Sequence, residues 1–116
     1  MQELVKMAKA LSDETRIRML KLLLEKDICI CEMEEIFHLS VSQLSRNSKM
    51  LMEAGFLKRW REGKCVVYIA DRDSQNHYCQ TILNMIAESF NDSELTRRDR
   101  SSLQQVITDQ VREKRK

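Results

Sequence analysis

Apolar residues recur three or four positions apart along most of the chain, and this spacing is typical of amphipathic helices. The pattern predicts a first helix over residues 2–11 and a second helix that continues to Leu24. Ser12 or Asp13 can cap the start of the second helix, because either side chain accepts a hydrogen bond from a free backbone N–H. A third helix of about two turns is expected to start near Cys31.

The next segment carries the signals of a further helix. Ser40 and Gln43 have the spacing of a capping box, and Gly55 is the residue type that commonly follows a helix end. The residues of this helix that are expected to face the core are Leu44, Met50 and Leu51. Two helices joined by a short turn, the second with a polar outer face, predict a helix–turn–helix.

The period changes to that of strands beyond the fourth helix. Residues 57–61 and 65–70 include β-branched and aromatic residues, and Gly63 lies in the turn between them, so a β-hairpin is predicted. A basic hairpin directly after a helix–turn–helix is a wing. The fold class predicted is mainly α with a small β-hairpin, a winged helix–turn–helix.

The helical period resumes after the hairpin. One stripe is predicted on a helix over residues 74–90, and its apolar members are Tyr78, Ile82, Met85, Ile86 and Phe90. A last stripe runs from Leu103 to Val111 between basic ends. We therefore expect a DNA-binding and dimerisation domain over residues 1–92 and a basic, partly helical C-terminal extension over residues 93–116.

Composition and charge narrow the class of protein. The net charge of +2 favours no partner, but residues 58–64 hold four cations and one anion, which makes a local basic patch. No charged-then-apolar leader opens the chain, and no apolar run approaches the ~18 residues of a membrane span. A cytoplasmic protein with no membrane partner is expected. No nucleophile–base pair or phosphate-cradling glycine loop stands out, which argues against an enzyme or an organic cofactor.

The outward residues of the fourth helix and of the wing suit DNA. Hydroxyl, amide and guanidinium groups on the helix can reach base edges or phosphates, and wing cations can lie along the backbone. The residues are Ser42, Gln43, Ser45, Arg46 and Lys49 on the helix and Arg59, Arg61 and Lys64 on the wing. Any one of them could be ordinary solvated surface, but a polar helix followed by a basic hairpin favours double-stranded DNA as the partner.

Four cysteines in a chain expected to stay reduced favour metal binding, redox sensing or simple burial over disulfides. Cys29 and Cys31 would point about 200° apart on a regular helix, so they can converge on one ion only where a helix starts or distorts. A helix N-terminus also favours the thiolate. On these grounds buried structural cysteines are the simpler interpretation, and Cys65 is interpreted as a strand filler.

Several stretches together resemble the ArsR/SmtB family of metal-sensing bacterial repressors. They are LSDETRIRML at residues 11–20, Cys29-Ile-Cys31, residues 40–56 ending in Met-Glu-Ala-Gly-Phe, and the wing. The similarity covers about residues 4–90. It implies a homodimeric winged helix–turn–helix repressor that leaves operator DNA when an effector binds, with residues 2–11 and 74–90 forming the dimer interface.

The chain also departs from the family. Many relatives carry His where this chain has Arg46 and Asn47, and they usually have Leu where it has Ser48. The family's zinc site on the helix after the wing is also not reproduced, since only Glu88 among its four matching positions is a ligand type.

The resemblance gives the cysteine pair a role. Cys29-Ile-Cys31-Glu-Met is similar to the Cys-Val-Cys-Asp-Leu element of arsenic, cadmium and lead sensors, which implies Cys29 and Cys31 as metal ligands. Arsenite-sensing members carry a third cysteine three residues later, where this chain has Glu34. The third ligand could be a hydroxide or small thiol, Cys79 of either protomer, or Glu34, which would favour Cd²⁺, Pb²⁺ or Zn²⁺ over arsenite. His38 and His77 are interpreted as surface or cap residues.

The expected function is therefore that of a transcriptional repressor released from its operator by a thiophilic effector. Arsenite, As(III), is the first expectation for the effector, and Cd²⁺, Pb²⁺ or Zn²⁺ is the alternative. A thiol-redox or persulfide sensor on the same fold is a second interpretation. A dimerisation module that binds no DNA is a third.

Overall fold

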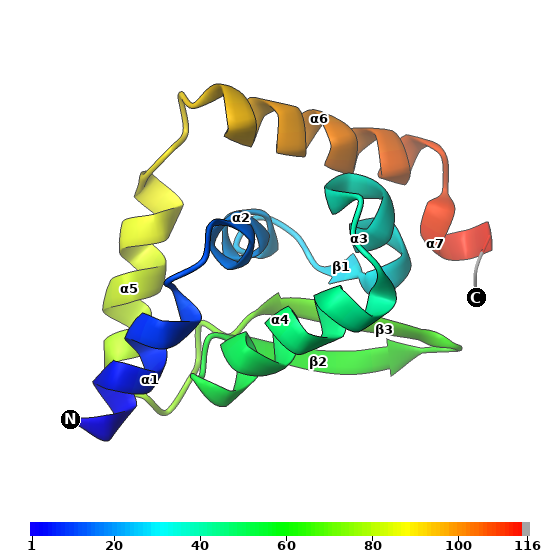
Figure 1. Cartoon of the computed structure of the whole chain (residues 1–116). Helices are drawn as coiled ribbons and strands as arrows, with labels where there is room; N and C mark the ends of the chain where they lie inside the picture. The colour runs from blue at the N-terminus through cyan, green and yellow to red at the C-terminus, as the bar shows by residue number, and fades with distance from the viewer. Residues whose placement is uncertain (115–116) are drawn as a thin grey trace.

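The computed structural model describes residues 1–114, in which seven helices and three strands follow one another (Figure 1). The elements are α1 (Gln2–Ala10), α2 (Glu14–Leu23), β1 (Ile28–Cys29), α3 (Ile30–Phe37), α4 (Val41–Glu53), β2 (Leu57–Glu62), β3 (Cys65–Ala70), α5 (His77–Glu88), α6 (Glu94–Thr108) and α7 (Val111–Lys114). This order confirms the mainly helical winged helix–turn–helix, in which α3 and α4 form the helix–turn–helix and β2 and β3 the wing.

Local sequence signals start and end the helices where they were predicted. Asp13 caps α2 by accepting a hydrogen bond from the backbone N–H of Arg16. The Ser40 hydroxyl and the Gln43 side chain satisfy each other's backbone N–H groups at the start of α4. Gly55 follows α4 with φ of +92°, a backbone conformation that costs little only for glycine.

One inward position of α4 was predicted wrongly. Leu44 and Leu51 are buried as expected, but Met50 is 39% exposed. Ser48 lies at the core-facing position instead and is fully buried. The 3.6-residue period explains this, because positions 44, 48 and 51 share one face of a helix and position 50 does not.

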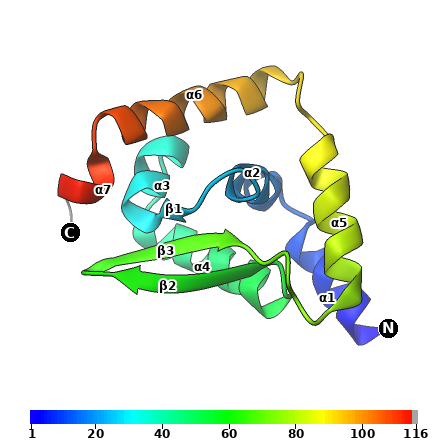
Figure 2. The same ribbon diagram turned by 180° about the vertical axis from the view of Figure 1, so that it is seen from behind.

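The three strands form one antiparallel sheet in the order β1-β3-β2 (Figure 2). In the wing, Leu57 pairs with Ala70 and Glu62 pairs with Cys65. The short strand β1 was not predicted. It places Cys29 opposite Val67 on β3, so the segment just before α3 is joined to the wing.

The C-terminal extension packs back on the rest of the chain. In Figures 1 and 2, α6 runs across α2 and α3 on the side away from the wing. Leu103 and Val106 of α6 and Val111 of α7 are buried in the same core as α2 and α3. The helical form of residues 94–108 agrees with the expected stripe, while Arg115 and Lys116 of the predicted basic end lie outside the described residues. None of the described helices is long and apolar enough to span a bilayer.

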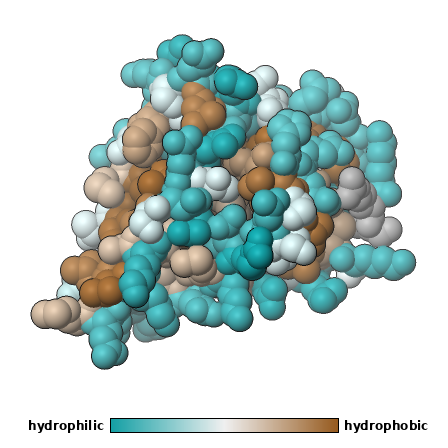
Figure 3. Space-filling view, in the orientation of Figure 1, coloured by the Kyte–Doolittle hydropathy of each residue, from teal (hydrophilic) through white to brown (hydrophobic). Residues whose placement is uncertain are grey.

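Helices α1 and α5 lie together at one end of the molecule, and this end exposes apolar side chains. Figure 3 shows hydrophobic residues along this edge. The exposed residues there include Leu4 and Val5 of α1 and Tyr78 and Met85 of α5. The stripe predicted for residues 74–90 is thus divided, since Ile86 faces the core while Tyr78, Met85 and Phe90 face outward. We refer to Leu4, Val5, Tyr78 and Met85 as the α1–α5 face.

Candidate metal centre

The two cysteines of the CxC pair lie at the start of α3. Cys29 is the N-cap residue, in extended backbone conformation, and Cys31 is the second residue of the helix. This is the kind of helix start at which residues two apart can converge. Glu32 accepts a hydrogen bond from the Cys29 N–H at 2.8 Å, as an acidic residue at the third helical position does in a capping box. The carboxylate therefore holds the turn that carries both thiols.

A third thiol joins the pair from the wing. The sulfurs of Cys29, Cys31 and Cys65 all lie within 4.8 Å of one another, and those of Cys31 and Cys65 are 3.8 Å apart. The sheet brings them together, because Cys29 pairs with Val67 and Cys65 lies two residues before Val67 on the same strand. Residues two apart on a strand share a face of the sheet. The interpretation of Cys65 as a strand filler is therefore incomplete, since its sulfur completes a three-thiol cluster.

All three thiols are buried. Burial raises the pKa of the Cys29 thiol well above its usual range, and the neighbouring Cys31 side chain adds to the shift. Burial also raises the pKa of the Cys31 thiol, and contact with Cys65 adds to this, while the hydrogen bond with Cys29 opposes it. The expectation that the helix N-terminus favours the thiolate is thus wrong for this pair, because desolvation outweighs the helix terminus.

The cluster fits a thiophilic ion. Two sulfurs bound to one ion at about 2.3 Å in tetrahedral geometry are about 3.8 Å apart. The Cys31 and Cys65 sulfurs already have this separation, and the widest pair in the cluster is at most 4.8 Å apart. Closing all three sulfurs onto one ion thus needs movements of about 1 Å or less. Three sulfurs with no nitrogen or carboxylate in the cluster favour soft ions.

The other sequence candidates lie outside the cluster. Glu34 is not a member of the three-thiol group. The Cys79 sulfur lies against the carbonyl oxygens of Gly55 and Ala54, at 3.3 and 3.6 Å, at the opposite end of α4. His38 ends α3 in the left-handed conformation, and His77 begins α5 at the surface.

The eight predicted DNA-contacting residues are all exposed. Ser45 and Lys49 of α4 line one shallow groove together with Arg59 of the wing, so the helix and the hairpin present their polar groups to a common space. Gln43 is also engaged in the cap of α4, and Lys49 lies 3.9 Å from Glu53 one turn later.

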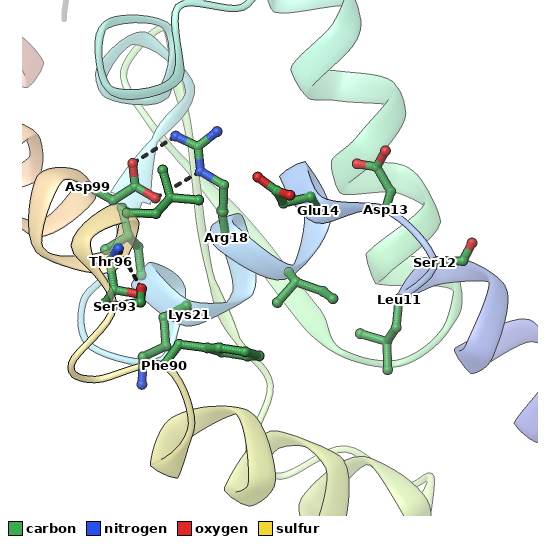
Figure 4. A pocket seen from close by; sticks show the side chains of 13 residues that line it. Leu11, Ser12, Asp13, Glu14, Arg18, Lys21, Phe90, Ser93, Thr96 and Asp99 are labelled. Carbon is green, nitrogen blue, oxygen red and sulfur yellow. Dashed lines mark hydrogen bonds and ion pairs between the residues drawn. The ribbon is translucent and has the colours of Figure 1, made fainter.

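A separate cavity contains no cysteine. It lies between α2 and the segment that joins α5 to α6, and Figure 4 shows its lining. Phe90 and Leu11 lie at its sides, and the Arg18 guanidinium donates two hydrogen bonds to the Asp99 carboxylate at 2.8 and 2.9 Å. This ion pair ties α6 to α2.

Sequence comparisons relate part of the chain to a known family. Residues 13–59 match the family model of the bacterial regulatory protein, arsR family. A cadmium resistance transcriptional regulatory protein CadC homolog of Staphylococcus aureus is 36% identical over 70 residues, which are 60% of this chain and 58% of that protein. The arsenic resistance transcriptional regulator ArsR1 of Pseudomonas putida is 41% identical over 61 residues, which are 52% of this chain and 48% of that protein.

A transcriptional repressor SmtB homolog of Synechocystis is 28% identical over 78 residues, which are 66% of this chain and 59% of that protein. The chain thus matches between 48% and 59% of the length of these three relatives. All three are named as regulators of transcription, not as enzymes.

Solved structures support the fold. Reduced HlyU from Vibrio cholerae superimposes with a TM-score of 0.64 at 22% identity, over 78% of this chain and 90% of that one. A homodimeric winged helix–turn–helix DNA-binding domain from Mycobacterium bovis, named as a possible ArsR-family transcriptional regulator, gives 0.63 at 16% identity, over 80% and 82%. Identities this low bear on the fold only. Residues 13–59, which include the helix–turn–helix, therefore match the arsR family, and this match confirms the resemblance over that part of a winged helix–turn–helix fold.

Proposed function

We propose that this protein is a dimeric, DNA-binding transcriptional repressor that is released from its operator by a thiophilic effector bound to Cys29, Cys31 and Cys65. The observation that carries the proposal is the group of three buried sulfurs within 4.8 Å, which joins the start of the helix–turn–helix to the wing. The names of the cadmium and arsenic resistance relatives are consistent with such an effector.

Arsenite fits this cluster better than a divalent cation does. Three thiols exchange with arsenous acid by forming three As–S bonds and breaking three As–O bonds. The three thiol protons leave with the hydroxides as water, and no atom changes oxidation state. The product is neutral, as a buried site requires. A divalent cation would instead displace three protons and leave a net charge of −1 on a buried group. Three sulfurs also match the pyramidal preference of arsenite.

The third thiol suggests how effector binding reaches the DNA-contacting residues. Cys65 is the first residue of β3, directly after the wing turn that carries Lys64, and it pairs with Glu62 on β2. Binding of one ion by all three sulfurs would shift Cys65 and the start of α3 relative to each other by up to about 1 Å, and the wing would move with Cys65 relative to α4. The Ser45 and Lys49 side chains on α4 and Arg59 on the wing then no longer present the same surface to a DNA backbone. A coupling of ~1–3 kcal/mol between the two sites is typical of such regulation.

The α1–α5 face supports dimerisation. Leu4, Val5 and Met85 are each about half exposed or more, and apolar patches of this kind mark interaction surfaces. A twofold partner that covers this face would present two copies of α4 to successive major grooves about one DNA turn apart. Operator binding by Ser42, Gln43, Ser45, Arg46, Lys49, Arg59, Arg61 and Lys64 is part of this proposal.

Effector titrations followed by gel shifts test the proposal. Wild type, Cys31→Ser and Cys65→Ser are titrated with arsenite and with Cd²⁺ while sulfur-to-metal charge-transfer absorbance is recorded. We expect each substitution to weaken binding on the order of 100-fold and to abolish release from DNA fragments of the upstream region of its own gene. Cys79→Ser is the matched control, because Cys79 is equally buried and lies outside the cluster. Unchanged effector binding by Cys65→Ser would refute the three-thiol site.

A redox sensor is the second candidate, and one distance favours it. The Cys31 and Cys65 sulfurs are 3.8 Å apart, so a peroxide could oxidise the two thiols to a disulfide, with loss of two protons and two electrons to the peroxide. Burial of both thiols opposes this, because buried cysteines react slowly with oxidants. Release from DNA by peroxide that is reversed by a reductant and is insensitive to arsenite would favour this candidate.

A further inference from the structure

One arginine of the C-terminal segment joins three elements that surround the thiol cluster. The Arg112 guanidinium donates hydrogen bonds to Glu32 Oε1 at 2.8 and 3.2 Å, to Asp27 Oδ2 at 3.2 Å and to the Asp27 carbonyl oxygen at 3.0 Å. It also lies 3.6 Å from the Glu62 carboxylate at the end of β2. We call Arg112 and these three acidic residues the Arg112 clamp.

Each carboxylate of the Arg112 clamp neighbours one of the thiols. Asp27 lies two residues before Cys29. Glu32 follows Cys31 in the chain and accepts the hydrogen bond of the Cys29 N–H. Glu62 is the strand partner of Cys65. The clamp therefore spans the same junction, between the start of α3 and the wing, that the three sulfurs span.

Burial makes the clamp costly to open. The side chains of Glu32 and Arg112 are 5% and 15% exposed. Burial opposes the charge of Arg112, but hydrogen bonds and attraction from Glu32 and Asp27 outweigh it and raise the pKa of the guanidinium. Without Arg112, Glu32 would be a buried carboxylate with its cation removed, and such groups move toward water. This movement would disturb the hydrogen bond that holds the Cys29 turn.

We infer that Arg112 is a positioning residue for the three-thiol site, which holds the start of α3 and the wing at the separation that lets Cys29, Cys31 and Cys65 converge. The C-terminal segment thereby becomes part of the effector site, although it contributes no ligand. The role in effector binding rests on the proposed function, whereas the role in holding the two elements together does not. Groups that orient metal ligands without touching the metal commonly change affinity by about 10- to 100-fold when they are removed.

Arg112→Met tests this inference, and Arg100→Met is the matched control. Arg100 is also a C-terminal arginine paired to the body of the chain, at 2.9 Å from Glu25, and neither residue belongs to the thiol cluster or to the Arg112 clamp. Each full-length variant is titrated with arsenite and Cd²⁺ by charge-transfer absorbance. Hydrogen exchange of residues 27–33 and 60–66 is measured in the metal-free state. Arg112→Met is expected to weaken binding by about 10- to 100-fold and to accelerate exchange in both segments, with little change in Arg100→Met.

Two further variants keep the inference testable if Arg112→Met does not fold. Arg112→Lys keeps the charge but cannot form the forked contacts, so it should restore folding and only part of the affinity. Glu62→Gln removes the negative charge that the wing presents to Arg112 and should accelerate exchange in residues 60–66 more than in residues 27–33. The inference is overturned if Arg112→Lys and Glu62→Gln both match Arg100→Met in exchange and in affinity. If wild type binds neither effector, the proposed function fails, and the metal-free exchange data still decide the role of Arg112.

Discussion

The two ends of this molecule differ in which side chains they expose and which they bury. At the end formed by α1 and α5, apolar side chains such as Leu4 and Met85 are exposed. At the end formed by α3, the wing and α7, charged and sulfur-containing side chains are buried, and Arg112 and Glu32 satisfy each other within the chain. Apolar surface without a cover is stabilised by a second molecule, whereas buried polar groups with partners need none.

This difference indicates that effector binding and dimerisation use separate parts of the proposed repressor. The effector site should operate within one protomer, because its three sulfurs and its clamp all come from one chain. Tight operator binding should need two protomers, because one copy of α4 reads only half of a symmetric site. Effector binding and dimerisation are then separable by mutation.

Charges placed on the α1–α5 face should have the largest effect. The double variant Leu4→Glu/Met85→Glu places carboxylates where a partner would bury them, so we expect monomers whose operator affinity falls on the order of 1,000-fold, or about 4 kcal/mol. Sedimentation and fluorescence anisotropy measure the two effects. Arsenite binding should remain within about threefold of wild type. Ser101→Glu/Gln104→Glu on the exposed side of α6 is the charge-matched control. A charged variant that loses effector binding together with its dimer would contradict the division.

Removing the Glu32 carboxylate tests how much the Arg112 clamp contributes to the stability of the end formed by α3, the wing and α7. Glu32→Ala leaves the Arg112 guanidinium without its closest partner and the Cys29 N–H without its acceptor, so the free energy of unfolding should fall by about 3 kcal/mol. Urea denaturation measures it, with Glu94→Ala in the exposed first turn of α6 as the control. An equal loss in both variants would mean that the Arg112 clamp contributes little to stability.

The helices and the wing could be predicted from the sequence, whereas the thiol cluster depends on pairing between distant segments. The cap residues Asp13 and Ser40 and the turn glycine Gly63 act on neighbours a few positions away, so they mark the helices and the wing reliably. Cys65 could not be assigned to the cluster, because β1 has only two residues and exists only through its pairing with β3.

The Arg112 clamp could not be predicted from the sequence for a related reason. Asp27 and Arg112 are 85 residues apart in the chain, and nothing near either residue indicates the contact. The exposed apolar residues were found as a periodic stripe, but periodicity does not tell a face that packs inside the protomer from one that packs on a partner. Ile86 and Met85 adjoin in sequence and illustrate both outcomes.

Proton release on binding should distinguish a divalent cation from arsenite at the thiol cluster. Burial raises the pKa of the Cys29 and Cys31 thiols, so both stay protonated from about pH 6 to about pH 8. A divalent cation must displace these protons, and its affinity should therefore rise with pH, by about tenfold per unit for each proton released. Arsenite affinity should stay nearly constant, because the protons leave as water. Absorbance titrations at several pH values decide this, and equal slopes for both effectors would contradict the charge argument.

Ser48 of α4 tests the expectation that a buried polar group needs a hydrogen-bond partner. Its hydroxyl is the one buried side-chain oxygen or nitrogen within residues 1–114 that has no hydrogen-bond partner. Removing an unsatisfied hydroxyl relieves its desolvation cost, so Ser48→Ala should increase the free energy of unfolding by about 1 kcal/mol. Ser45→Ala on the exposed face of α4 controls for helix propensity. A loss of stability in Ser48→Ala would indicate a hydrogen bond made to water or by an alternative rotamer.

The strand register that brings Cys65 beside α3 also affects how long the protein would survive in a cell. An ion joining Cys31 and Cys65 would close a ring of chain whose ends are 34 positions apart, and the whole of α4 lies inside this ring. A cross-link that closes a loop of this size stabilises a folded chain by about 4 kcal/mol through the entropy of the unfolded state. Proteases act on chains that open, so the effector-bound form of the proposed repressor would be degraded more slowly than the effector-free form. Exposure to the effector would then leave behind a long-lived pool of repressor that is ready to bind its operator once the effector is gone.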